Sequence, residues 1–165
     1  MELPDALDLT DGRLRAVEPA DWRLDQALSR VPDVTRWTYY PADASEEVAR
    51  ARVARNIELR RDGRGGRFII ESGGIPVGTI GISLRIDGPY LYYALLPEAR
   101  GRGLVTSAVV ALTGWAFAQG EPRVHAVTRL DNGASERVLE RASFARVGVE
   151  VEPDGHTVTR WVTEQ

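Results

Sequence analysis

The most informative segment of the sequence is Leu95-Leu96-Pro97-Glu98-Ala99-Arg100-Gly101-Arg102-Gly103-Leu104-Val105-Thr106, which joins a predicted strand to a predicted helix. The strand, from Tyr90 to Leu96, is aromatic and apolar. The helix runs from about Gly103 to Gln119 and has apolar residues at helical spacing on its inner face. A strand, a glycine-rich loop and a long helix in this order predict a crossover in an α/β sheet.

The loop has the features of an anion site. Gly101 and Gly103 permit unusual backbone angles and the close approach of a ligand to main-chain N–H groups. The start of the following helix offers free N–H donors and about half a positive charge. Arg100 and Arg102 add cationic, forked donors that suit phosphate oxygens. The loop therefore predicts a cradle for a pyrophosphate-sized anion. The alternative is a glycine-rich turn with solvent-facing arginines.

Two other phosphate-binding loops compare less well with this stretch. A Walker-type loop ends in Gly-Lys-Ser/Thr, and this chain contains no Lys. A dinucleotide-binding loop compares better, with Gly101, Gly103 and Thr106 at the expected spacing and Glu121 further on. However, its third small position is Thr here, and the strands before the loop form hairpins rather than βαβ units. Dinucleotide binding therefore stays the weaker of the two interpretations.

Outside this stretch, the sequence predicts the elements of a single mixed α/β domain over residues 1–165. Predicted strands lie at residues 12–17, 67–72, 77–86, 90–96, 123–128, 144–151 and 157–162. Predicted helices lie at residues 19–29, 45–61, 103–119 and 134–142, and residues 34–41 form an aromatic-rich connection. We therefore expect an α/β (α+β) fold with a mixed, mostly antiparallel sheet of about six or seven strands and about four helices.

The composition excludes several classes of enzyme. The chain has 165 residues, a formal net charge of −3, no Cys, no Lys and only two His. Disulfides, a catalytic thiol and a Schiff base are thereby excluded, and no metal site is expected. The acidic balance argues against a nucleic-acid partner, and no apolar run approaches the roughly 18 residues of a membrane helix. Because the first residues lack a signal-peptide pattern, we expect a cytoplasmic protein.

The loop resembles the acetyl-CoA loop of the GNAT superfamily of N-acetyltransferases, whose consensus is Gln/Arg-x-x-Gly-x-Gly/Ala. Three further segments resemble the RimJ/RimL-like branch, which acetylates protein N-termini and small amines. They are Gly12-Arg13-Leu14-Arg15, Asn132-Gly133-Ala134-Ser135 and Leu139-Glu140-Arg141-Ala142-Ser143-Phe144-Ala145-Arg146-Val147-Gly148. The resemblance spans almost the whole chain and implies the GNAT fold with acetyl-CoA (coenzyme A) as the cofactor.

The resemblance also implies cofactor-binding roles for particular residues. The pyrophosphate of CoA would bind the backbone amides of Arg100, Gly101, Arg102, Gly103, Leu104, Val105 and Thr106. Main chain at Leu95 and Leu96, on a strand splayed from its neighbour, would pair with pantetheine like an added strand. Asn132 would hydrogen-bond the pantetheine arm, while Ser135 would protonate the leaving thiolate or orient a water. Helix capping also explains Asn132 and Ser135, and both roles can coexist.

The implied reaction is direct attack of a neutral amine on the acetyl carbonyl. It needs a base for the ammonium proton, a donor for the oxyanion and an acid for the thiolate. Backbone N–H groups on the splayed strand would supply the oxyanion donor. Many relatives place a Glu base where this chain has Tyr90, and Glu98 and Ser143 also depart from the family pattern. A Tyr with a pKa near about 10 is a poor base but a good donor, so Tyr90 is a candidate catalytic residue and the base stays unassigned.

Aromatic residues mark the candidate acceptor site. Trp37 and Tyr39 lie where relatives build the acceptor wall, and Tyr92 shares a strand face with Tyr90. Core packing is the alternative for each of these aromatic residues. A run of arginines is interpreted as a solvated helix face, with an acidic-substrate or RNA-facing edge as the alternative. The run consists of Arg50, Arg52, Arg55, Arg60, Arg61, Arg64 and Arg67.

Together these features predict an acetyl-CoA:amine N-acetyltransferase that acts through a ternary complex. The expected acceptor is a small-molecule amine, favoured by the acidic balance and the aromatic connection. A peptide or protein N-terminus is the alternative acceptor. A GNAT-like module that binds CoA without turnover is the alternative from a different class. Family members often pair through edge strands, which implies that a homodimer can form.

Overall fold

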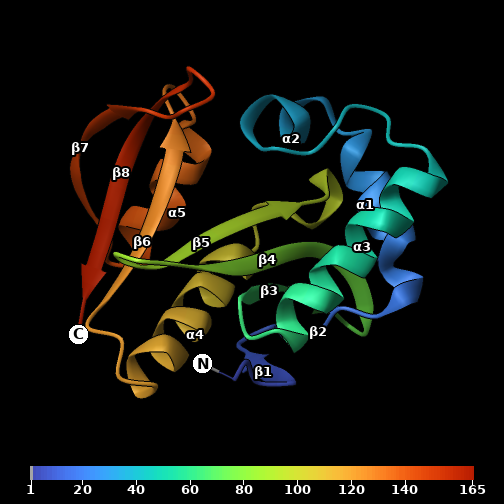
Figure 1. The fold of residues 1–165 in the computed structure, drawn as a ribbon, viewed down its shortest axis with the longest axis horizontal. Coiled ribbons are helices and arrows are strands. Elements are labelled where there is room, and N and C mark those ends of the chain that lie inside the picture. The colour runs from blue at the N-terminus through green and yellow to red at the C-terminus, as the bar shows by residue number, and fades with distance from the viewer. Residues whose placement is uncertain (1) are drawn as a thin grey trace.

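The computed structural model describes residues 2–165, which fold around one sheet with the strand order β1-β2-β3-β4-β5-β6-β8-β7 (Figure 1). Adjacent strands are antiparallel except β5 and β6, which are parallel. Such a parallel pair needs a crossover, and helix α4 supplies it. The strands are β1 (Ala6–Leu9), β2 (Gly12–Ala16), β3 (Gly65–Ser72), β4 (Ile75–Arg85), β5 (Gly88–Leu95), β6 (Arg123–Arg129), β7 (Ala145–Val151) and β8 (Thr157–Glu164).

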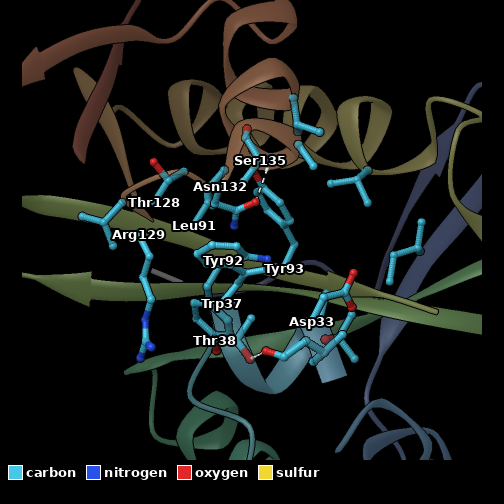
Figure 2. Close-up of a pocket in the computed structure, with 18 of the residues that line it drawn as sticks. Asp33, Trp37, Thr38, Leu91, Tyr92, Tyr93, Thr128, Arg129, Asn132 and Ser135 are labelled. Atoms are coloured by element: carbon cyan, nitrogen blue, oxygen red, sulfur yellow. Dashed lines mark hydrogen bonds between the residues drawn. The ribbon is translucent and has the colours of Figure 1, made fainter. Parts of the chain in front are cut away.

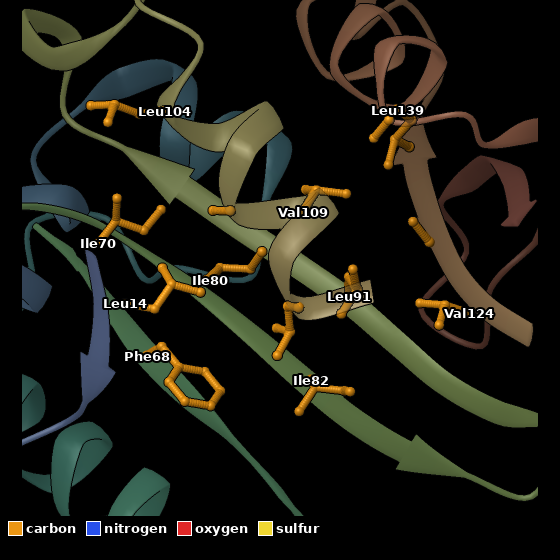
Figure 3. Close-up of a cluster of buried hydrophobic side chains, with 14 of the residues drawn as sticks. Leu14, Phe68, Ile70, Ile80, Ile82, Leu91, Leu104, Val109, Val124 and Leu139 are labelled. Carbon is orange, nitrogen blue, oxygen red and sulfur yellow. The ribbon is translucent and has the colours of Figure 1, made fainter. Parts of the chain in front are cut away.

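Helices cover both faces of the sheet. They are α1 (Trp22–Ser29), α2 (Pro32–Trp37), α3 (Glu46–Arg61), α4 (Leu104–Ala118) and α5 (Gly133–Arg141), with 3-10 turns at Pro19–Asp21 and Pro97–Ala99. On one face, α1 and α3 bury Leu28 and Val53 against Ile69. On the other, α4 closes a larger core (Figure 3), to which strand residues such as Phe68 and the helix residue Val109 contribute.

The predicted fold class is confirmed, with one strand and one helix more than expected among residues 2–165. Strand β1 has only four residues, and it is held at the sheet edge by pairing with β2. Helix α2 begins at Pro32, a residue that suits the first helical turn because it has no N–H to satisfy. The sequence analysis predicts a connection over residues 34–41, and α2 takes up the first part of it. No helix within residues 2–165 is long and apolar enough to cross a membrane.

Strands β5 and β6 diverge soon after they meet. Their pairing is confined to Tyr90 with His125 and Leu91 with Ala126. Beyond Leu91, the β6 side of β5 is therefore open. The backbone N–H of Leu96 donates to Val77 O on the β4 side at 2.9 Å, and successive backbone groups of a strand alternate between its two sides. The N–H groups of Tyr93 and Leu95 consequently point into the opening between β5 and β6.

Candidate active site

A cavity of about 690 Å³ lies at the opening between β5 and β6 (Figure 2). The two faces of β5 carry different side chains into it, because Tyr92 and Tyr93 point to opposite sides of the strand. The structure brings most of the predicted site residues together here. Those lining the cavity are Trp37, Tyr39, Tyr90, Tyr92, Leu95, Arg100, Gly101, Gly103, Leu104, Val105, Thr106, Asn132 and Ser135. Leu96 and Arg102 do not line it.

The glycine-rich loop has the conformation that an anion cradle requires. Gly101 and Gly103 both adopt a φ of 76°, a left-handed backbone that non-glycine residues rarely take. Gly103 is the N-cap of α4, and the helix begins with the bond from Ser107 N to Gly103 O at 2.9 Å. Within residues 2–165, no side chain caps this end and its first turn contains no acidic residue. The N–H groups of Leu104 to Thr106 are therefore free to bind an anion.

Arg100 has a different local role from the predicted phosphate donor. Its guanidinium binds both carboxylate oxygens of Asp33 on α2, at 2.5 and 2.9 Å. It also donates twice to the carbonyl oxygen of Leu95, at 2.9 and 3.1 Å. The hydrogen bond from Arg100 lowers the pKa of Asp33 below its ordinary value. Arg100 thus ties the loop to α2 and to the end of β5.

Asn132 and Ser135 lie at the start of α5. Asn132 Oδ1 accepts from the backbone N–H of Ser135 at 3.3 Å, so Asn132 caps the helix. The Ser135 hydroxyl lies 2.6 Å from the hydroxyl of Tyr93 on β5 (Figure 2). Burial raises the pKa of Tyr93 well above its ordinary value, so this hydroxyl stays protonated at neutral pH.

The sequence prediction did not include Tyr93 among the site residues. It lies 42 positions before Ser135 in the chain, and only the fold brings the two hydroxyls together. One available signal was the alternation along β5, which places Tyr93 on the face opposite Tyr90 and Tyr92.

Tyr90 lines the cavity, but its hydroxyl is already bonded within the protein. It donates to Asp87 Oδ2 at 2.6 Å and accepts from Arg160 Nη2 at 3.0 Å. Its ring stacks on His125, with the two ring centroids 4.9 Å apart. Burial and the bond to Asp87 raise its pKa. A hydroxyl that is bonded on both sides and has a raised pKa is poorly suited to act as a base. The catalytic role of Tyr90 stays a prediction, and the geometry does not strengthen it.

Trp37, Tyr39 and Tyr92 line the cavity with different exposures. Tyr92 lies over Gly81, where an added Cβ would be 2.1 Å from its ring. Glycine at position 81 therefore allows the ring to lie flat on the sheet. Tyr39 is 65% exposed, and its hydroxyl bonds the carboxylate of Glu152. Trp37 on α2 is half-buried and stacks with Arg36, whose Cζ is 4.3 Å from the ring centroid.

Buried tyrosines predict a loss of stability at alkaline pH. Burial raises the pKa of Tyr40 and of Tyr93, whereas an unfolded tyrosine ionises near pH about 10. Above that pH the folded chain binds more protons than the unfolded chain, so the free energy of unfolding falls as pH rises. Each such tyrosine contributes a slope of about 1.4 kcal/mol per pH unit. Since the chain has no Lys, no lysine ionises in this range.

Urea unfolding at a series of pH values around 10 and above measures this slope. The Tyr93→Phe variant is expected to show a slope lower by one tyrosine's contribution. An unchanged slope in this variant would mean that Tyr93 ionises as readily in the folded protein as in the unfolded one.

The comparisons with known proteins agree with this geometry. The family model described as "Acetyltransferase (GNAT) domain" matches residues 13–145. A search of curated proteins finds no match. Solved structures similar in fold include the Microcin C7 self immunity acetyltransferase MccE in complex with acetyl-CoA and AMP. That structure has a TM-score of 0.88 and 15% identity, with 99% of this chain and 98% of that chain covered.

Two further solved structures share the fold. One is the Salmonella typhimurium acetyltransferase that modifies the N-terminal serine of ribosomal protein L7/L12, with a TM-score of 0.84, 23% identity and coverage of 94% and 96%. The other is Mycobacterium smegmatis RimJ, with a TM-score of 0.83, 21% identity and coverage of 99% and 88%. These likenesses show the fold. The family match covers most of the chain. This chain belongs to the GNAT family of acetyl-CoA-dependent acetyltransferases.

Proposed function

We propose that this chain acetylates the primary amine of a small molecule, with amine and acetyl-CoA bound together in a ternary complex. The observation that carries the proposal is the cavity at the opening between β5 and β6. On one side it holds the anion cradle, and on the other the aromatic side chains of Trp37 and Tyr92. A cofactor and an acceptor can thus approach β5 from opposite faces. When bound, acetyl-CoA supplies an activated acetyl thioester.

Each step of this reaction can be assigned to particular residues of the chain. The free N–H groups of Leu104 to Thr106 would hold the pyrophosphate. The open N–H groups of Tyr93 and Leu95 are the donors for the charge that develops on the carbonyl oxygen. Ser135 would give its proton to the departing sulfur and take one back from Tyr93, 2.6 Å away. The amine nitrogen would lose one proton to solvent as the amide forms, and Tyr93 would recover one from solvent, so the protons balance.

The carboxylates that line the cavity are engaged elsewhere. Asp33 binds Arg100, and Glu152 binds Tyr39. We therefore propose that the amine binds in its neutral form, and that the rate rises with pH towards the pKa of the acceptor. A peptide N-terminus has a lower amine pKa than an alkylamine and remains the alternative acceptor. The Salmonella typhimurium neighbour acts on such a terminus. A single domain, a cytoplasmic location and a homodimer remain predictions.

Thermal unfolding with and without acetyl-CoA tests the proposal first. At about 100 times its Kd, a ligand adds about 2.7 kcal/mol of stability, which raises the Tm by several degrees. We expect a shift with acetyl-CoA but not with NAD or ATP. Release of free CoA is then measured with small amines and with peptides as acceptors. A shift with NAD alone would favour a dinucleotide site. Acetyl-CoA binding without turnover on any amine would favour a CoA-binding module.

A further inference from the structure

Two arginines of the run that was interpreted as a solvated face point inward. Arg52 on α3 and Arg67 on β3 both line the cavity. Their side chains are only 24% and 12% exposed. They lie on the face of the sheet that carries Tyr92, since the Arg67 Cζ is 5.6 Å from the centroid of the Tyr92 ring. The solvated-face interpretation is therefore wrong for these two residues.

One carboxylate serves both guanidinium groups. Asp25 Oδ2 accepts from Arg52 Nε at 2.8 Å, and Asp25 Oδ1 accepts from Arg67 Nη1 at 2.9 Å. Asp25 is 2% exposed. Two cations against one anion leave an excess positive charge at this end of the cavity, and a charge without a partner is costly in a buried site.

Arg67 also has donor capacity that the fold leaves unused. Both of its hydrogen bonds come from Nη1, to Asp25 and to the Tyr40 hydroxyl at 3.0 Å. Its Nε has no acceptor within residues 2–165 but is fully buried, whereas Nη2 makes no hydrogen bond and is not among the fully buried donors. Nη2 is therefore the donor that a ligand in the cavity can reach. The planar guanidinium group presents its donors as a fork that matches a carboxylate or a phosphate.

The rest of the acceptor side is cationic as well. Arg85 and Arg129 line the cavity there, and each lies over a tyrosine ring, 4.0 and 5.6 Å from its centroid. The carboxylate of Glu152 is bonded to Tyr39. The cavity therefore gathers positive charge, although the chain as a whole has a formal net charge of −3.

We propose that the acceptor carries, besides its amine, an anionic oxygen group that binds Arg67. A carboxylate and a phosphate share the required chemistry. The anion supplies the acceptor that the Arg67 donors lack and balances the excess charge beside Asp25. This inference rests on the proposed function, because it concerns the acceptor half of the same cavity.

Matched acceptors test it. One series consists of ω-amino acids of increasing length, the second of the corresponding uncharged carboxamides, and the third of aminoalkyl phosphates. We expect the wild-type protein to acetylate the better anionic series with a kcat/KM about 30-fold above the carboxamides, as for a charge-assisted hydrogen bond. The more active anionic series identifies the group as carboxylate or phosphate.

Variants of Arg67 separate recognition from folding. Arg67→Gln leaves Asp25 paired with Arg52, so the buried carboxylate keeps a partner. We expect Arg67→Gln to lower kcat/KM far more for the anionic acceptors than for the carboxamides, so that the preference is lost, and Arg67→Lys to retain part of the preference. The control is Arg64→Gln, because Arg64 is exposed in the bend before β3. It should leave every rate unchanged.

The outcomes separate this inference from the proposed function. If the wild-type protein acetylates carboxamides with the same kcat/KM as the anionic acceptors, the inference is wrong and the proposed function stands. The same conclusion holds if Arg67→Gln keeps the preference for anionic acceptors. An equal loss on charged and uncharged acceptors would show a structural role for Arg67 and would also overturn the inference. If acetyl-CoA does not raise the Tm and no amine is acetylated, the proposed function fails, and this inference fails with it.

Discussion

Replacing Ser135 with alanine is expected to lower kcat about 100-fold, the size of effect typical of a lost general acid. The Ser135 hydroxyl is the polar group that Tyr93 holds beside the opening of β5, at 2.6 Å. Its removal takes away the proton that we propose for the departing sulfur. The helix start is kept, because the cap on α5 uses the backbone N–H of Ser135 and the side chain of Asn132. Affinity for acetyl-CoA should therefore change little while kcat falls.

Two tyrosine variants on the same strand serve as matched controls. Tyr93→Phe removes the hydroxyl that orients Ser135, so we expect an intermediate loss of kcat, about tenfold. Tyr90→Phe removes a hydroxyl that bonds Asp87 and Arg160, and its kcat should stay near that of the wild type. Stopped-flow or steady-state release of CoA measures all three variants. A wild-type rate in Ser135→Ala, or a larger loss in Tyr90→Phe than in Tyr93→Phe, would contradict this assignment.

The features from which we propose the cofactor half of the site could be predicted because they are local in sequence. Gly101 and Gly103 indicate a left-handed backbone conformation, and both residues adopt it. The free first turn of α4 follows from the absence of an acidic residue after Gly103. The splay of β5 from β6 was expected from the family resemblance and is seen in the pairing, which stops after Leu91.

The acceptor half depends on contacts between residues far apart in sequence. The pairing of Arg67 with Asp25 joins β3 to α1, and nothing in the sequence indicates that these residues, 42 positions apart, lie side by side. The same holds for Arg100, whose forked donors suited a phosphate but bind Asp33. Pattern and composition identify which residues can form ion pairs, whereas the fold decides which of them are satisfied within the protein and which remain open to a ligand.

Replacing Thr106 with glutamate is expected to raise the stability of the fold while it weakens acetyl-CoA binding about 100-fold. Thr106 is in the first turn of α4, where a negative charge interacts favourably with the helix dipole by about 0.3–1 kcal/mol. The same carboxylate would lie in the cradle proposed for the pyrophosphate, where it would compete for the free N–H groups and repel the ligand. A rise in stability together with a loss of affinity is the result specific to this site, since a variant that merely damages the fold lowers both.

Thr106→Gln is the matched control, because glutamine has nearly the size of glutamate without its charge. Its affinity for acetyl-CoA should fall much less. Urea unfolding and calorimetric titration of CoA measure the two effects, and equal affinities for the glutamate and glutamine variants would place the pyrophosphate elsewhere.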